Sequence, residues 1–193
     1  MISAISDDEI IYVDEVGFNV SMRTKKGRSL IGTPAVKTVP SIRSRNISVC
    51  CAMGKRGIIN FKIQVMAFKT TTFGGFIDEL LSKRDTLNFK QAIIIMDNVT
   101  FHKNINIKQK FNEISRKLMF LPPYSPFLNP IEHLFSKWKL LIRQSNPMNE
   151  PELLDLIQST SKQISKENCE GFFRSIYEFL PKCLNSEPIF DGN

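Results

Sequence analysis

The chain has 193 residues, 42% of them hydrophobic and 23% charged, with 9 Gly and 10 Pro. This is the composition of a folded globular domain, and it excludes collagen, coiled coil and extended disorder. The length predicts one domain with an appendage, divided here into a main domain over residues 1–145 and a C-terminal helical extension over 146–193 packed on it. No apolar run approaches the roughly 18 residues of a membrane span, and the acidic N-terminus is unlike a secretory signal, so neither membrane insertion nor secretion is expected.

The net charge of +7 is unevenly distributed. No Asp or Glu lies between Val16 and Ile77, whereas eleven of the 26 Lys and Arg residues do. One-sided charge favours a polyanionic partner, so we expect nucleic acid; a merely solvated basic face is the alternative. The candidate DNA-binding residues are Arg23, Lys25, Lys26, Arg28, Arg43 and Arg45. By composition, the run from Arg23 to Arg28 fits a nuclear signal and a DNA-contacting hairpin equally well.

The four cysteines give no sign of a disulfide framework or a thiolate zinc site. They include one adjacent pair and no C-x-x-C spacing, and they are Cys50, Cys51, Cys169 and Cys183. We expect buried thiols in a reducing compartment.

The first half of the chain carries strand patterns. Glu9–Asp14 is a short β-branched run that predicts a strand with its carboxylate at the C-terminal tip. Residues 46–53 and 58–65, joined by a turn at 54–57, predict an antiparallel hairpin, whose second arm alternates apolar and polar residues as a half-buried strand does.

Crossover elements follow the hairpin. Residues 72–84 have apolar side chains at helical spacing, and 92–97 form an unbroken apolar run ending in an acid, as in a buried central strand. A helix is expected at 105–114 and a fifth strand at 117–121. The proline-rich residues 122–126 must be an irregular connector, because neither a helix nor a central strand accommodates them.

Three helices complete the chain. The first opens with Asn129 as the expected N-cap and Pro130 in the first turn. Its apolar stripe comprises Ile131, Leu134, Phe135, Trp138, Leu141 and Ile142. Two more amphipathic helices are expected at 151–164 and 166–180. The order of elements implies an α/β fold with a five-stranded mixed sheet, three antiparallel strands followed by two parallel ones, flanked by helices.

Three carboxylates stand where apolar elements present them: Asp14, Asp97 and Glu132. If the strands of Asp14 and Asp97 are parallel neighbours, these acids meet at the carboxyl end of the sheet, and such hard oxygen ligands suit Mg²⁺ or Mn²⁺. Local roles remain open. A strand-end Asp often caps a turn, Glu15 competes with Asp14 for any metal role, and Glu132 occupies the third helical position of a capping box.

Four segments resemble the catalytic domain of mariner-superfamily DDE transposases and related bacterial insertion-sequence enzymes. They are YVDEVGFN (12–19), RSRNISVCCAM (43–53), IIMDNVTFHK (94–103) and LPPYSPFLNPIEHLFSKWK (121–139). They occur in the family's order, and 34 residues separate Asp97 from Glu132, as in the Asp-Asp-Glu branch of that family.

The resemblance implies a ribonuclease H-like DDE catalytic domain in which Asp14, Asp97 and Glu132 hold two Mg²⁺ or Mn²⁺ ions. It implies metal-dependent cleavage at a transposon end and joining of the freed 3′-hydroxyl to target DNA. The expected partners are transposon-end and target DNA and a second copy of the chain, with no small-molecule substrate. The expected location is the nucleus in a eukaryote and the cytoplasm in a bacterium.

Other residues have weaker claims to a role. His102 occupies a position that the family often fills with His, where it could contact a phosphate or orient the loop, or be satisfied by local hydrogen bonds. Asn98 could support a metal ligand or form a turn. Tyr124, in the proline-rich connector, could pack or contact DNA. Trp138 and Phe135 fall on the apolar stripe and are expected in the core.

Members of the family carry helix-turn-helix domains ahead of the first catalytic Asp, whereas thirteen residues precede Asp14 here. The resemblance therefore also allows a fragment or split frame of a longer transposase. The rival hypothesis is a truncated relic that binds DNA without cleaving it. A third hypothesis is a ribonuclease H-like nuclease acting on RNA hybrids.

Overall fold

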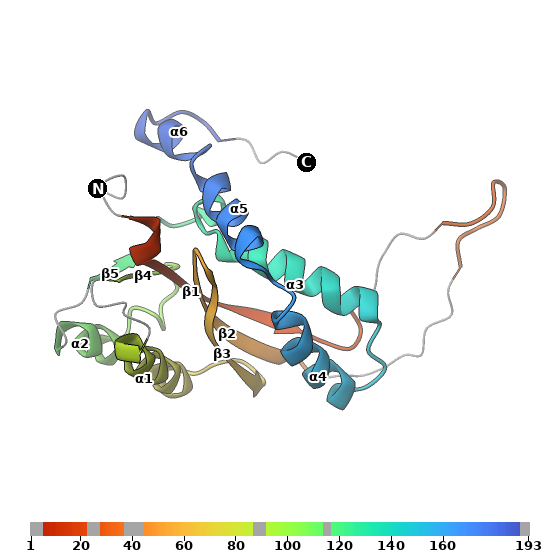
Figure 1. Ribbon diagram of the computed structural model, residues 1–193, viewed down its shortest axis with the longest axis horizontal. Coiled ribbons are helices and arrows are strands. Elements are labelled where there is room, and N and C mark those ends of the chain that lie inside the picture. Colours follow the sequence, from red (N-terminus) through yellow and green to blue (C-terminus); the bar gives the residue numbers. More distant parts are fainter. Residues whose placement is uncertain (1–5, 23–27, 37–44, 87–91, 114–116, 190–193) are drawn as a thin grey trace.

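The computed structural model describes residues 6–22, 28–36, 45–86, 92–113 and 117–189. Five strands and the helices that flank them make up this part of the chain (Figure 1). In order, the elements are η2 (Asp7–Glu9), β1 (Ile10–Phe18), β2 (Ile47–Gly54), β3 (Gly57–Val65), α1 (Thr70–Thr86), β4 (Ile93–Met96), α2 (Ile105–Glu113), β5 (Leu118–Phe120), η3 (Pro126–Leu128), α3 (Ile131–Ser145), α4 (Glu150–Ser161), α5 (Lys166–Ile176) and α6 (Leu180–Leu184).

The strands form one mixed sheet in the order β3-β2-β1-β4-β5. β2 pairs antiparallel with β1 and with β3, while β4 lies parallel to β1 and to β5. The α/β fold with three antiparallel strands and two parallel ones, inferred from the order of elements, is therefore confirmed. The parallel pairs are possible because α1 and α2 supply the long connections that return the chain to the same edge.

Helices cover both faces of the sheet (Figure 1). One buried cluster joins β1 and β4 to α1 and α2 through side chains such as Val13, Phe73 and Phe111. The other joins the opposite face of β1 to α3, α4 and α5 through Tyr12, Trp138 and others. Because side chains alternate along a strand, even-numbered positions of β1 from Ile10 to Phe18 face α3 and odd-numbered ones near its centre face α1.

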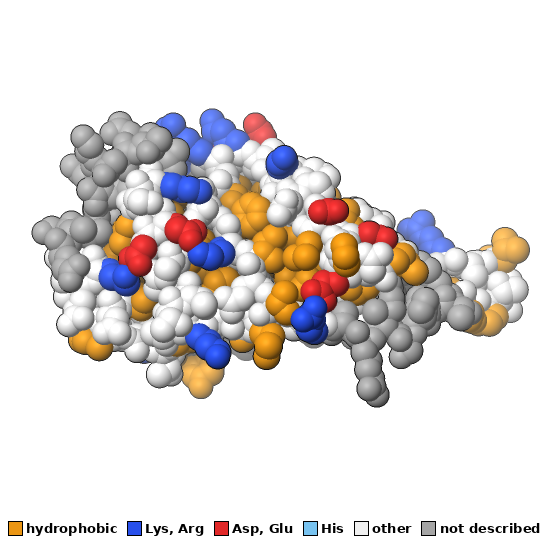
Figure 2. Space-filling view, turned by 90° about the horizontal axis from the view of Figure 1, so that it is seen from below, with side chains coloured by type: hydrophobic (Ala, Val, Ile, Leu, Met, Phe, Trp, Pro, Cys, Tyr) orange, Lys and Arg blue, Asp and Glu red, His pale blue; other side chains and the backbone are white. Residues whose placement is uncertain are grey.

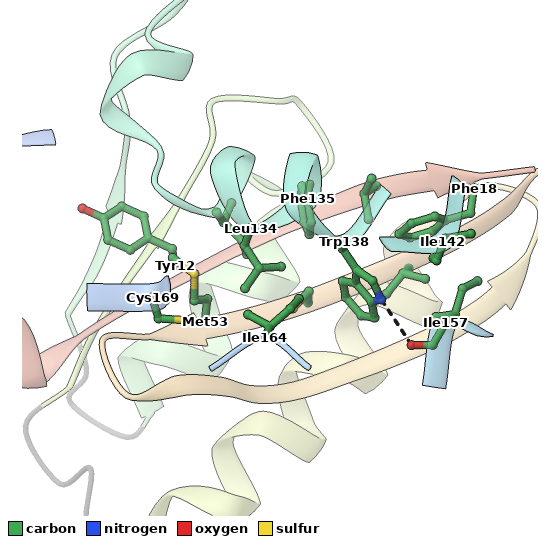
Figure 3. Close-up of a cluster of buried hydrophobic side chains, with 14 of the residues drawn as sticks. Tyr12, Phe18, Met53, Leu134, Phe135, Trp138, Ile142, Ile157, Ile164 and Cys169 are labelled. Carbon is green, nitrogen blue, oxygen red and sulfur yellow. Dashed lines mark hydrogen bonds between the residues drawn. The ribbon is translucent and has the colours of Figure 1, made fainter. Parts of the chain in front are cut away.

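Trp138 lies at the centre of the larger cluster (Figure 3). It is fully buried, its ring meets the edges of Phe18 and Phe61, and its indole Nε1 donates to the Ile157 carbonyl oxygen at 3.2 Å and to Thr160 Oγ1 at 3.0 Å. The indole thus ties α3 to α4. The expectation that Trp138 and Phe135 belong to the core is confirmed.

The residues of the C-terminal extension share this core. Leu153, Ile157, Cys169 and Phe173 belong to the same buried cluster as β1 and α3. No helix in the described ranges is both long and apolar enough to cross a bilayer. Cys50, Cys51 and Cys169 are buried free thiols, and Cys183 is half-buried.

Three details differ from the sequence-based expectations. β1 does not end at Asp14 but continues to Phe18, because β2 pairs with it as far as Phe18 and Ile47 although β4 has already ended. α3 begins at Ile131 with Pro130 as the N-cap, and no side chain of the described residues caps it. The last expected helix is two: α5 ends at Ile176 and α6 begins at Leu180.

Candidate active site

The sheet register brings Asp14 and Asp97 together. Val13 of β1 is opposite Met96 of β4 in the parallel pair, and the next residue on each chain is an Asp. Parallel neighbours lie about 4.8 Å apart, so the two carboxylates start from adjacent backbone positions. Asp14 is in mid-strand, but it lies at the point where its parallel partner stops, which opens space beside it.

Glu132 reaches the same place by a different route. After β5 the chain runs through the proline-rich connector and η3 to the first turn of α3, where Glu132 lies. Asp14 is two residues from Tyr12 and from Val16 on the same strand, so its side chain lies on their face of the sheet, which is the face that α3 covers. All three acids line one pocket of about 450 Å³, together with Asn98, Tyr124 and Asn129, among others.

Asp14 is held by two hydrogen bonds. Asn129 Nδ2 donates to Asp14 Oδ2 at 2.8 Å, and the backbone N–H of Glu15 donates to Asp14 Oδ1 at 2.7 Å. Burial, reinforced by the nearby charges of Asp97, Glu15 and Glu132, raises the pKa of Asp14 to about 7. Asp14 thus shares this pocket with two other acids, and the described residues that line it include no Lys, Arg or His.

Asp97 has a different environment, because it is fixed by His102. Nδ1 of His102 lies 2.6 Å from Asp97 Oδ1, and the Val99 N–H donates to the same oxygen at 3.3 Å. Burial opposes ionisation, but the hydrogen bond and charge of His102 outweigh it and hold the pKa of Asp97 below its ordinary value. Asp97 is therefore an ionised carboxylate in a fixed orientation.

Glu15 holds the other side of the same imidazole. His102 Nε2 lies 3.0 Å from Glu15 Oε1, and Cys50 Sγ donates to that oxygen at 3.7 Å. His102 is fully buried and stacked on Phe73, with ring centroids 4.4 Å apart. Burial disfavours its charge, but the hydrogen bonds to Asp97 and Glu15 raise the pKa of His102 to about 9.

Two residues of this site were assigned other roles from the sequence. Glu15 was treated as a competitor of Asp14, but it points to the opposite face of the sheet and reaches Asp97 through His102. The opposite orientation of neighbouring strand residues and the family resemblance already indicated that Glu15 is not a ligand, but neither predicted its contact with His102. Asn129 was expected only as a helix cap, and no local signal reveals its hydrogen bond to a residue 115 positions earlier.

The remaining candidates lie at the pocket wall. Burial, together with the charge of Asp97, raises the pKa of Glu132, although Lys139 opposes this. Tyr124 is 98% exposed, so it does not pack in the core, and its positive φ of 57° is rare for a residue other than glycine. It stands at the pocket rim, available to a ligand.

The side chains at this pocket offer oxygen atoms of the kind that a hard divalent cation prefers. Beside the three carboxylates, Asn98 Oδ1 is buried at the pocket wall and receives no hydrogen bond from the residues that the structure describes. An oxygen in this state gains by meeting a cation, as do the carboxylates of Asp14 and Glu132, whose pKa is raised by burial and by the charge of Asp97. Within the described ranges, no three His, Cys, Asp or Glu side chains are drawn tightly enough around one point to hold an ion.

The basic stretch is less one-sided in space than in sequence. Four of its cations pair with acids from outside it: Arg45 with Glu150, Lys55 with Asp7, Arg56 with Asp8, and Lys62 with Glu79. Figure 2 shows blue and red side chains lying side by side over one face. Of the candidate DNA-binding residues, Arg28 and Arg45 are exposed. The other four, Arg23, Lys25, Lys26 and Arg43, lie outside the described residues.

The fold and pocket define a ribonuclease H-like domain with three acids at one edge of a mixed sheet. A comparison with protein families matches residues 9–154 to the model described as DDE superfamily endonuclease. The chain belongs to this family. A search of curated protein sequences found no match.

Solved structures give the same fold. The Mos1 mariner paired-end complex with Mn has a TM-score of 0.80 and 17% identity over 94% of this chain and 56% of that chain. The pre-cleavage Mos1 transpososome has a TM-score of 0.78 and 18% identity over 96% of this chain and 58% of that one. The catalytic domain of Mos1 mariner transposase has a TM-score of 0.69 and 15% identity, covering 95% and 85%. This chain thus spans little more than half of the transposase in the two complexes.

Proposed function

We propose that this chain is the catalytic domain of a DDE-type transposase, which cleaves DNA phosphodiesters and joins the freed 3′-hydroxyl to target DNA. The observation that carries the proposal is the convergence of Asp14, Asp97 and Glu132, from three separate elements, on one pocket. Membership of the endonuclease family and the fold shared with a mariner transposase support it.

Two divalent ions, Mg²⁺ or Mn²⁺, complete the proposal, with Asp14, Asp97 and Glu132 as the residues that would hold them. Bound cations of this kind supply a more acidic water or hydroxyl nucleophile and neutralise charge on the leaving oxygen. The transposase complexes with similar folds were solved with Mn and with Mg.

The protein's own part in the reaction is positioning. His102, itself held by Glu15, keeps Asp97 ionised, Asn129 orients Asp14, and the first turn of α3 places Glu132. Tyr124 and Pro123 form an exposed wall against which the DNA backbone can lie. DNA is the proposed partner, because a solved complex with this fold contains a transposon end, and a second copy of the chain is proposed because that complex is described as paired-end.

A plasmid-nicking assay tests the proposal. The purified chain should convert supercoiled plasmid to the open circle with millimolar Mn²⁺, and Asp97→Asn should lower the rate at least a hundredfold while the circular dichroism spectrum is unchanged. Asp155→Asn, a matched change on the exposed face of α4, should nick like the wild type. Equal nicking by Asp97→Asn would show that the activity resides elsewhere.

The rival, a DNA-binding relic without activity, predicts different results with the same protein. DNA affinity would fall steeply with salt, while titration with Mn²⁺ would release no heat and no nicking would occur. An RNA–DNA hybrid in the same assay tests the third hypothesis, because a ribonuclease H-like enzyme would cut the RNA strand in preference to plasmid DNA.

A further inference from the structure

A second pocket adjoins the candidate active site and has no part in the chemistry proposed above. Its volume is about 250 Å³. Its walls are mostly aliphatic and aromatic, from β1, β4, the end of β5, η3 and α5, with Ile10, Ile95, Met119, Leu128 and Ile176 among them. Tyr177, which follows α5, and Leu180, the first residue of α6, also line it.

The Tyr12 side chain lines this mostly apolar space. Tyr12 is only 3% exposed, its ring meets the edge of Phe173 at 5.5 Å, and Figure 3 shows its hydroxyl pointing away from the rest of the cluster. None of the hydrogen bonds among the described residues involves that hydroxyl, and it is not among the buried side-chain atoms without a partner, so its oxygen opens onto the pocket. Burial, with Tyr177 and Asp7 nearby, raises the pKa of Tyr12 above its ordinary value, so the hydroxyl remains a neutral donor.

The charge at the pocket rim is already satisfied. Asp7 accepts a hydrogen bond from the Tyr177 hydroxyl and forms an ion pair with Lys55 at 3.0 Å. It therefore offers no free partner to a cation, and its negative charge disfavours an anionic ligand. These conditions select an uncharged molecule.

We propose that this pocket is a binding site for a small uncharged aromatic molecule with one acceptor oxygen. That oxygen accepts a hydrogen bond from the Tyr12 hydroxyl. A dry cavity of about 150 Å³ holds one benzene ring, so this pocket has room for a substituted ring of roughly ten heavy atoms. The acceptor oxygen distinguishes such a ligand from a plain hydrocarbon, because it accepts a hydrogen bond from the Tyr12 hydroxyl at the pocket wall.

A ligand in this pocket would affect the position of Asp97, because the pocket shares a wall with the candidate active site. Leu121 and Pro122 line both pockets. The Leu121 N–H donates to the Met96 carbonyl oxygen at 2.9 Å, one residue before Asp97. A ligand that packs against Leu121 therefore presses on the connector between β5 and α3 and on the end of β4.

Acetophenone and ethylbenzene are the matched probes, because they share a ring and a two-carbon substituent but only acetophenone has a carbonyl oxygen. Affinities are measured by following backbone amide signals of the ¹⁵N-labelled chain as each probe is added. The ratio of acetophenone to ethylbenzene affinity should fall by about two- to tenfold in Tyr12→Phe, the loss expected for one neutral hydrogen bond. Tyr124→Phe, the same change outside the pocket, should leave the ratio unaltered.

Two further variants locate the site. Leu128→Phe and Leu180→Phe each add volume from a different wall and should weaken both probes, and circular dichroism shows which of them folds. In the wild type, acetophenone should shift the amides of Asp97 and Asn98 but not those of Thr71 and Thr72 at the start of α1, on the far face of the sheet.

The experiment tests the ligand site and its link to the active site separately. No binding to the wild type, or an unchanged ratio in Tyr12→Phe, would overturn the ligand site. Binding without a shift at Asp97 and Asn98 would overturn the link to the active site. The experiment requires no DNA cleavage, so its failure is distinguishable from failure of the proposed function.

Discussion

His102 holds Asp97 by a hydrogen bond of 2.6 Å between Nδ1 and Oδ1. The opposite nitrogen of the same ring meets Glu15, which comes from β1 and not from the loop that carries His102. The imidazole therefore fixes the end of β4 against β1 at the edge where the acids gather. Such a bridge orients a carboxylate before any ligand arrives, which is what a site built from separate elements requires.

Replacing His102 by Ala should reduce both stability and nicking. The change leaves two carboxylates unbridged and a cavity beside Phe73, so the free energy of unfolding should fall by about 2–4 kcal/mol in urea titrations. His102→Asn, which keeps a donor near the position of Nδ1, should recover part of the nicking rate lost in His102→Ala and bind Mn²⁺ more tightly than that variant. Equal Mn²⁺ affinity in the two variants would mean that the ring acts only as core packing.

Removing the Asp14 charge should stabilise the chain when divalent ions are removed with EDTA. The pKa of Asp14 is raised from 3.8 to about 7 in the folded state, so the folded chain binds the extra proton between these values. The stability that the protonated form of Asp14 contributes is thus fully present below pH 4, and it is lost as the pH rises to 7 and beyond. Asp14→Asn should therefore raise the free energy of unfolding by about 0.5–2 kcal/mol at pH 8, and by less at pH 5.

Mn²⁺ provides the complementary measurement. It should raise the melting temperature of the wild type at pH 8, because it binds the folded state alone, and it should have little effect on Asp14→Asn. A melting temperature of the wild type that does not respond to Mn²⁺ would count against Asp14 as a ligand.

Asn129→Ala should disorder Asp14 without removing its charge. The substitution deletes the donor to Asp14 Oδ2 in a position that is only 4% exposed, so stability should fall by about 1–2 kcal/mol. Nicking should decline while the apparent Mn²⁺ requirement rises, measured as rate against Mn²⁺ concentration. Ser125→Ala, which changes a side chain of the same pocket that contacts only a backbone oxygen nearby, is the control.

Trp138→Phe should weaken the contact between α3 and α4. The smaller ring loses the hydrogen bonds to the Ile157 carbonyl oxygen and Thr160 and leaves a gap beside Phe18, which should cost about 1–3 kcal/mol in the free energy of unfolding. Trp138 is the only tryptophan of the chain, so its emission reports on this contact directly. In the wild type the emission should lie at short wavelength and move to longer wavelength in a single transition with urea.

The sequence predicted the fold well where the signal was local. The alternation of residues 58–65, the apolar run at 92–97 and the stripe of α3 each follow from one element burying one face, and no distant residue is needed to read them. The ends of elements were less predictable. β1 runs past Asp14 because a partner strand, β2, supports it there. α5 ends at Ile176 although Leu180, at the start of α6, still packs against the core.

The distribution of charge shows most clearly what could not be predicted from the sequence. The acid-free stretch from Val16 to Ile77 suggested a basic face, but Lys62 and Glu79, 17 positions apart, pair on the surface, and Arg45 meets Glu150 from α4. Counting charges along the chain cannot reveal such pairs, because they depend on which elements pack together. The family resemblance therefore supported nucleic acid as the partner better than the distribution of charge along the sequence did.

The sequence alone determined the strands, the helices, the order of the acids and the family that they resemble, because each of these is written in local spacing. Only the tertiary structure decided that Asp14 stands beside Asp97, that Glu15 and His102 fix the latter, that Asn129 orients the former, and that the Tyr12 hydroxyl faces a second pocket. Side-chain partners that lie 87 or 115 positions apart meet only when the sheet register and the helix packing are set. These are properties of the assembled core, to which every element contributes.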